Sequence, residues 1–245
     1  MNFYSVIIGS ELLNGRRRDS HFDFLNKELI KRGWEQKGSF VIKDDFKLIE
    51  DIFNLIKSDE KSVMFSFGGI GSTPDDITRA VSAEVFGDGK LHIHDEVFKI
   101  IIDKFGDEAY PYRIKMSELP KDAELLKNVV NNIPGFQMKN RFFFTPGFPS
   151  MAQSMVVEAL DNFYPQHKAK FREGFLAQSS ENEFINLMNE VPPSIELSSL
   201  PSMVGEKREV EISLLGESKD EVLKELNRFI NYMNEKKINF TNKGK

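Results

Sequence analysis

The chain has 245 residues, of which 40% are hydrophobic and 29% charged, the balance of an ordinary globular protein. It contains no cysteine, which excludes disulfide scaffolds, thiolate nucleophiles and cysteine-ligated metal centres. Its formal net charge of −5 argues against a strongly basic surface for nucleic acid or anionic lipid. Neither a signal peptide nor a membrane span is recognisable, so we expect no membrane partner and a cytoplasmic location.

Predicted strands and helices alternate through residues 3–105. Short apolar runs end in glycine or lead to aspartate, and the segments that follow repeat apolar residues at helical spacing behind an aspartate or serine cap. Nearly continuous apolar strands predict a mostly parallel α/β sheet with helices on both faces. The expected strands are 3–9, 35–42 and 62–67, and the expected helices are 20–33, 44–56, 75–86 and 95–105.

Beyond Tyr110 this alternation loosens. A short strand at 124–126, a hairpin formed by 136–138 and 141–145, and a helix through 151–160 complete the first expected domain, residues 1–167. Residues 168–245 form a predicted small α+β domain. Its expected strands are 169–176, 195–200 and 208–215, its expected helices are 180–189 and 218–234, and its tail, 241–245, is expected to be frayed.

The strongest functional signal is the string GGIGSTPDDIT, residues 68–78, between an apolar strand and a helix. Open α/β sheets bind ligands at such a point, and glycines let backbone N–H groups approach an anion closely. The string matches neither a Walker loop nor the dinucleotide fingerprint. Asp75 and Asp76 would repel a phosphate unless a cation lay between them, which suggests Mg²⁺-type chemistry. A tight turn followed by aspartate caps is the simpler alternative, and glycines and caps alone would favour it.

Acidic residues also follow the first two strands. Glu11 and Asp19 flank the turn after strand 3–9, and Asp44 and Asp45 follow strand 35–42. Parallel strands would gather these loops at one edge of the sheet, beside the glycine-rich string. Helix N-caps would explain each acid separately, so both interpretations stay open.

Six segments, GSELLNGRRRDSH, VIKDD, GGIGSTPDDIT, ELPKDAELLKN, IPGF and TPGFPS, resemble the amino-terminal domain of the CinA family in order and spacing. That domain is similar to the molybdopterin-binding MogA/MoaB domain and to a domain of eukaryotic FAD synthases. The resemblance covers about 1–165, and the rest of the chain looks like the KH-type subdomain that follows in CinA proteins. A segment resembling their nicotinamide-mononucleotide deamidase domain is absent from this sequence.

The resemblance implies a three-layer α/β/α fold that binds a phosphorylated small molecule, a nucleotide or a pterin, with a divalent metal (Mg, Mn or Co). For CinA-like relatives the implied activity is ADP-ribose pyrophosphatase; the alternative is a non-catalytic, molybdopterin-binding or adenylylating domain. Asp44, Asp75 and Asp76 would then be the catalytic and metal-holding residues. The implied ligand-binding residues are Glu11, Asp19, Gly68, Gly69, Gly71, Ser72, Thr73, Thr78, Pro146 and Gly147. A homo-oligomer, dimer or trimer, is also expected.

Three positions depart from the family pattern. Ser72 stands where the family usually has proline, His21 where it has asparagine, and Met151 where it has glutamate. The serine loosens the loop and adds a hydroxyl, whereas His21 adds bulk and a titratable group. These departures leave the activity itself open.

Weaker candidates have simpler explanations. His92 and His94 could share one strand face as metal ligands, but no cysteine or third histidine lies nearby in sequence, so a surface or structural role is expected. The run 16–18, three arginines, either contacts a ligand phosphate or is a solvated loop. Trp34 and the 22 phenylalanines are expected in the core. Residues 168–245 lack a Gly-x-x-Gly loop and a basic face, so we expect a packing or dimerisation module rather than an RNA binder.

Overall fold

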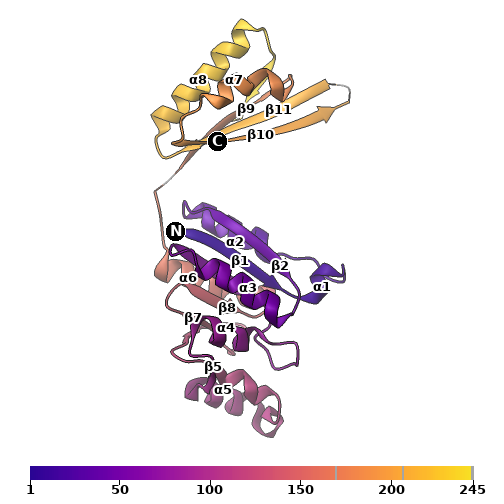
Figure 1. Ribbon diagram of the computed structural model, residues 1–245, viewed down its shortest axis with the longest axis vertical. Helices are drawn as coiled ribbons and strands as arrows, with labels where there is room; N and C mark the ends of the chain where they lie inside the picture. Colours follow the sequence, from indigo (N-terminus) through magenta and orange to yellow (C-terminus); the bar gives the residue numbers. More distant parts are fainter. Residues whose placement is uncertain (169, 206, 244–245) are drawn as a thin grey trace. The chain divides into compact units, whose positions relative to one another are not determined.

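The structure is a computed structural model that describes residues 1–168, 170–205 and 207–243 (Figure 1). The chain divides into two compact units, Met1–His167 and Lys168–Lys245, and each is described here by itself. Among the described residues, no helix combines the length and the apolar character needed to cross a membrane.

A six-stranded sheet forms the centre of the first unit, in the order β2-β1-β3-β8-β7-β6. The first four strands are mutually parallel, and the remaining pairings are antiparallel. The strands are β1 (Asn2–Ile8), β2 (Gln36–Ile42), β3 (Ser62–Phe67), β6 (Glu124–Leu126), β7 (Gly135–Met138) and β8 (Phe142–Thr145). The prediction of a mostly parallel sheet is therefore confirmed, and the hairpin around residues 139 and 140 turns with both of them at positive φ.

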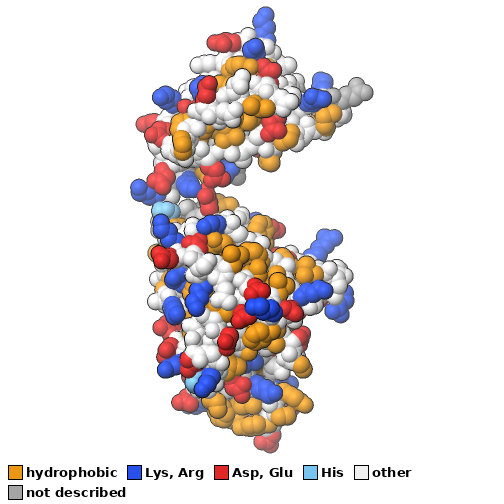
Figure 2. Space-filling model, in the orientation of Figure 1, with side chains coloured by type: hydrophobic (Ala, Val, Ile, Leu, Met, Phe, Trp, Pro, Cys, Tyr) orange, Lys and Arg blue, Asp and Glu red, His pale blue; other side chains and the backbone are white. Residues whose placement is uncertain are grey.

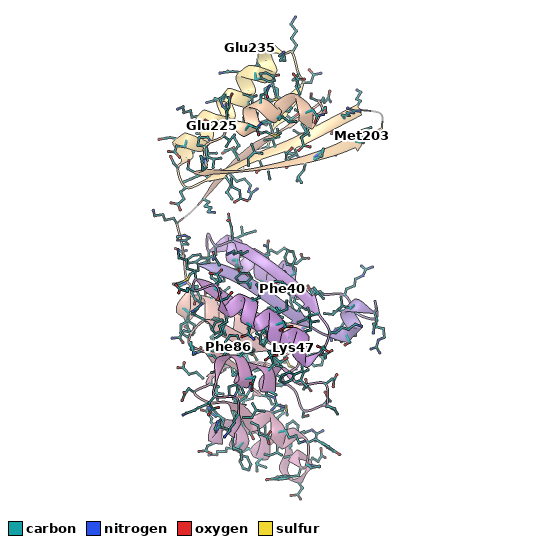
Figure 3. The ribbon with its side chains drawn as sticks, in the orientation of Figure 1. Phe40, Lys47, Phe86, Met203, Glu225 and Glu235 are labelled. Atoms are coloured by element: carbon teal, nitrogen blue, oxygen red, sulfur yellow. The ribbon has the colours of Figure 1, made fainter. Side chains whose placement is uncertain are left out.

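Helices cover both faces of this sheet, which confirms the three-layer arrangement. Alternate side chains of one strand enter opposite cores: Phe142 and Phe144 of β8 face one core, and Phe143 faces the other. Phe86, labelled in Figure 3, stacks on Phe142 with 4.1 Å between ring centroids. The first core also contains α3 (Phe46–Lys57), α4 (Thr78–Phe86) and α5 (Asp95–Phe105), and the second contains α2 (His21–Lys31) and α6 (Pro149–Phe163).

Most of the short elements of this unit were not predicted. Two very short strands pair antiparallel in a separate sheet, and a one-turn helix follows β1. The strand expected at His92 is β4 (Leu91–Ile93), which ends one residue before His94. His94 is the N-cap residue of α5, but its backbone is still extended and its nitrogen donates to the Ser117 carbonyl oxygen at 2.8 Å, while His92 pairs with Asp88 at 3.0 Å. These elements are α1 (Ser10–Leu13), β4 (Leu91–Ile93), β5 (Glu118–Pro120), η1 (Gly106–Ala109) and η2 (Arg113–Ser117).

The second unit is an antiparallel sheet in the order β10-β11-β9-β12, with a long helix packed against it. Its elements are β9 (Phe171–Ala177), η3 (Glu181–Phe184), α7 (Ile185–Asn189), β10 (Ile195–Val204), β11 (Lys207–Gly216), α8 (Lys219–Glu235) and β12 (Phe240–Asn242). The core packs Phe175 and Phe184 against Phe229 of α8. The KH-type assignment of this unit stays a prediction.

The ends of this unit differ from the prediction or lie outside the described residues. The tail 241–245 is not wholly frayed, because Thr241 and Asn242 belong to β12 and pair with β9. β12 occupies an edge of β9 that would otherwise leave backbone groups without partners. Gly244 and Lys245 lie outside the described residues, as does Ala169, at which the first strand of this unit was expected to begin.

Candidate ligand site at the glycine-rich loop

The glycine-rich loop lies at the carboxyl edge of the parallel strands. The loops that follow β1, β2, β3 and β8 all leave the sheet at this edge, because parallel strands end on the same side. Gly147, in the loop after β8, lies so close to Gly68 that an added Cβ would come within 3.4 Å of the Gly68 Cα. The structure therefore brings the 68–78 string and the turn at Gly147 together, two segments that the family resemblance placed on the ligand side.

Gly68 and Gly69 have conformations and surroundings that only glycine satisfies. Their φ angles are +103° and +70°, in the region that side chains disfavour. A Cβ on Gly68 would lie 2.4 Å from the carbonyl oxygen of Ile8, and one on Gly69 would lie 2.2 Å from Oγ1 of Thr78. The two glycines thus allow the loop to run between the end of β1 and the start of α4.

Asp76 closes this loop by accepting hydrogen bonds from Thr73. One of its carboxylate oxygens lies 2.7 Å from the Thr73 backbone nitrogen and 2.6 Å from the Thr73 hydroxyl. Within the part of the chain that the structure describes, the N–H groups of Gly69, Ile70, Gly71 and Ser72 donate no hydrogen bond to another residue. Four consecutive N–H groups at the edge of the sheet are suited to binding an anion.

Arg79, in the first turn of α4, was not predicted as a site residue. Only 6% of it is exposed, and its guanidinium donates to the carbonyl oxygens of Gly71 (2.7 Å), Glu118 (3.0 Å) and Lys115. Its Nε is buried without a partner, as is the Thr78 hydroxyl. Burial lowers the pKa of Arg79, while the charges of Asp76 and Glu118 oppose that shift. In the sequence, Arg79 is the one charged residue between Ile77 and Val81, and this position directly after the glycine-rich string is the signal that could have identified it.

The acidic residues after β1 and β2 have partners within their own loops or in the neighbouring loop, and two of them cap helices. Asp44 accepts from the backbone nitrogen and hydroxyl of Ser10, at 2.8 and 2.9 Å, and so holds the start of α1. Asp19 accepts from the first two N–H groups of α2, at 2.9 and 3.1 Å. Asp45 caps α3, and Glu11 lies 3.8 Å from Arg17. The helix-cap alternative therefore describes the local geometry of Asp19 and Asp45, whereas Asp44 joins the loop after β2 to the loop after β1.

The three carboxylates expected to hold a metal do not form one cluster. Among the residues that the structure describes, no group of three or more His, Asp or Glu side chains is arranged to hold an ion. Asp44 is bonded to Ser10, and Asp76 is bonded to Thr73. Hydrogen bonding from Thr73 lowers the pKa of the neighbouring Asp75, which keeps that carboxylate ionised. At most the Asp75–Asp76 pair offers ligands at the loop, and metal binding stays a prediction.

An apolar hollow of about 150 Å³ opens on the α4 side of the loop. Ile70, Gly71 and Arg79 line it from the loop and α4, and Pro146 lines it from the turn after β8. Its far wall includes Asn128 and Asn131, which the sequence analysis did not single out, together with Met116, Leu119, Phe136 and Met151. Ile70 and Gly71 thus belong both to the hollow and to the segment of free N–H groups.

On the β1–α2 side of the loop the space is only about 20 Å³. His21 fills this side: 6% of it is exposed, its ring stacks on Phe67 at 4.4 Å, and its Nε2 lies 3.3 Å from the Gly147 carbonyl oxygen. Burial lowers the pKa of His21, which keeps its ring neutral. Glu11 and Asp19 line the same small space. The two sides of the glycine loop therefore differ sharply in the room that they offer.

The remaining charged and aromatic candidates take ordinary positions. The arginines 16–18 are exposed, and the guanidinium of Arg17 lies over the Phe148 ring at 5.4 Å. Trp34 is only partly buried: it packs on Phe3 at the edge of the second core and stacks on His167. Figure 2 shows basic and acidic side chains interspersed on the visible face of each unit.

Comparisons with known proteins identify relatives of the whole chain and of the first unit. Residues 5–166 match the family described as a probable molybdopterin binding domain. A protein of Archaeoglobus fulgidus is 26% identical over 97% of this chain and 100% of its own length. A putative competence-damage inducible protein of Clostridioides difficile is 27% identical over 94% of this chain but only 56% of its own length. The solved structure of a Thermoplasma acidophilum protein, titled CinA with unknown function, is similar with a TM-score of 0.59 at 25% identity, over 66% of this chain and 98% of that one.

Proposed function

The chain belongs to the molybdopterin-binding domain family as a CinA-like member, and on that premise we propose that it binds a phosphorylated, pterin-related small molecule at the glycine-rich loop. The observation that carries the proposal is the apolar hollow of about 150 Å³ that is lined by Ile70 and Gly71, the two central residues of the four whose N–H groups donate no hydrogen bond to another described residue. An anion-binding loop beside an apolar hollow suits a ligand with a phosphate at one end and a flat ring at the other.

The residues of the hollow fit both parts of such a ligand. The phosphate would take hydrogen bonds from the loop, close to the positive end of α4 and to the buried cation of Arg79. The ring would lie among Ile70, Phe136 and Met151, whose side chains supply apolar contact. The Nδ2 of Asn131 contacts only the Met151 sulfur, at 3.5 Å, and so can donate to a ring oxygen or nitrogen.

Calorimetric titration with neopterin monophosphate tests this proposal. Met151→Trp should fill the hollow and weaken binding at least about tenfold, because the ring then has no space. Leu55→Trp, at an exposed position of α3 outside the hollow, is the matched control and should bind like the wild type. Inorganic phosphate should compete with the ligand. Absence of binding to the folded wild type, or equal affinity in the two tryptophan variants, would contradict the proposal.

A second candidate function is metal-dependent hydrolysis of ADP-ribose. It is favoured by two adjacent carboxylates, Asp75 and Asp76, beside N–H groups suited to a diphosphate. Magnesium is commonly held by one or two carboxylates together with substrate phosphates, so this pair fits an ion without Asp44. When bound, the ion would offset phosphate charge and lower the pKa of a bound water.

Chromatography of the products separates the two candidates. Addition of water across the diphosphate of ADP-ribose yields AMP and ribose 5-phosphate, and these products should appear only with Mg²⁺, Mn²⁺ or Co²⁺. If neopterin monophosphate binds and no ion supports product formation, the chain is a binding module. Product formation that survives Asp75→Asn and Asp76→Asn together would contradict a role for this pair.

A further inference from the structure

The imidazole of His21 occupies a space with the features of a ring-binding slot. It lies on the ring of Phe67 with 4.4 Å between centroids and 22° between planes, which is the geometry of a stacked pair. Its Nε2 is 3.3 Å from the carbonyl oxygen of Gly147, so the flat ring also has a polar contact at its edge. A stacking face with one polar contact is how proteins commonly hold a small heteroaromatic ring.

The slot is adjacent to the glycine loop. Phe67 is the last residue of β3 and precedes Gly68, and Gly147 touches Gly68. Arg17 and Arg18 line the same space, so a ring in the slot would lie next to a phosphate on the loop and near cationic side chains. With the imidazole in place only about 20 Å³ remains, which is enough for about one water and not for a second ring.

Local hydrogen bonds hold His21 in this place. Asp19 accepts from the backbone nitrogens of His21 and Phe22, at 2.9 and 3.1 Å, and so fixes the first turn of α2. The Phe22 side chain, one position later, points elsewhere and is 42% exposed. The start of α2 thus sets the position of the His21 imidazole. Phe22 is a neighbouring aromatic residue that does not fill the slot.

We propose that His21 is a specificity-determining residue that fills a heteroaromatic-ring slot on Phe67 and thereby limits ligands of the glycine loop to one heteroaromatic group, on the α4 side. This inference rests on the proposed function for the presence of a phosphate ligand at the loop, but the slot itself does not depend on that ligand. A ligand with a heteroaromatic group on both sides of its phosphates is excluded as long as the imidazole occupies the slot.

Imidazole itself is the probe for the slot. In His21→Ala at pH 8, added imidazole should bind where the side chain was and raise the thermal midpoint saturably, by about 2–4 °C. The wild type should show no such rise, and neither should Phe22→Ala, the matched control. An equal response of all three proteins, or no response of folded His21→Ala, overturns the proposal.

ADP-ribose and NAD⁺ test the consequence for specificity, because they share a diphosphate and adenosine and differ by one nicotinamide ring. In EDTA, His21→Ala should raise the affinity for NAD⁺ relative to ADP-ribose about tenfold over the wild type. His21→Phe keeps the slot filled and should retain the wild-type ratio. An unchanged ratio in His21→Ala, or a raised ratio in His21→Phe, overturns the proposal.

Two further outcomes keep the inference separable from the proposed function. Should His21→Ala fail to fold, His21→Asn also uncovers the face of Phe67 and takes its place in both experiments. If the wild type binds no phosphate ligand while imidazole still stabilises His21→Ala, the proposed function fails and the slot stands. If ligands bind the loop and imidazole stabilises no variant, the slot fails and the proposed function stands.

Discussion

Replacing Asp76 tests whether its carboxylate acts by holding the loop or by acting on a ligand. One oxygen of Asp76 accepts from the nitrogen and the hydroxyl of Thr73, at 2.7 and 2.6 Å. Side-chain caps of this kind contribute about 0.5–2 kcal/mol each. Because Thr73 is exposed, we expect both bonds together to contribute about 1–2 kcal/mol, below the sum of two strong caps. Asp76→Ala should therefore lower the thermal midpoint by about 2–8 °C.

Asp76→Asn is the matched variant, because its amide oxygen can still accept from Thr73 while the negative charge is lost. Its midpoint should stay within about 2 °C of the wild type. Circular dichroism melts measure both shifts in thermal midpoint, and titration with neopterin monophosphate measures the affinity of the loop for its ligand. If the carboxylate acts on a metal, Asp76→Asn loses ADP-ribose hydrolysis at nearly unchanged stability. An Asp76→Ala protein that melts with the wild type would refute the reasoning, because the two bonds would then contribute nothing.

Three further predictions concern single positions. Gly69→Ala should cost about 2–4 kcal/mol in urea unfolding, since positive φ and a contact with Thr78 both oppose a Cβ; Gly15→Ala, at φ +78° with open space around it, should cost only about 1 kcal/mol. Burial lowers the pKa of His21 below its ordinary 6.5, so the unfolded state binds the proton more readily. The free energy of unfolding should therefore fall as the pH drops below 6.5. A pH series of melts should show a smaller fall in His21→Phe. Asp45→Ala should cost about 1 kcal/mol through the lost cap of α3, and an unchanged unfolding midpoint in urea would contradict that role.

Local pattern determined the sheet and its helices. Apolar runs such as 62–67 became β3 with every residue buried, and helical spacing over 46–56 became the buried face of α3. The type of each element can be predicted locally, because the spacing of apolar residues depends only on neighbouring positions in the sequence. The glycine-rich string was recognised for the same reason, since its φ angles and its place after a strand depend on a few adjacent residues.

Distant partners decided what the sequence left open or misplaced. Asp44 could have been a metal ligand or the cap of the helix that follows it, and instead it accepts hydrogen bonds from Ser10, because the fold brings the Ser10 hydroxyl within 2.9 Å of it. The terminal residues around Thr241 pair with β9, a partner that no local pattern indicates.

The residues around the loop show the same division. The sequence placed an anion-binding loop after β3, and the tertiary structure decided which side of that loop is open. His21 meets Phe67 and Gly147 through segments far apart in the chain, while Arg79 meets carbonyl oxygens of η2 and β5. A side chain's burial and hydrogen-bond partners depend on which elements pack beside it, and only the folded chain fixes that packing.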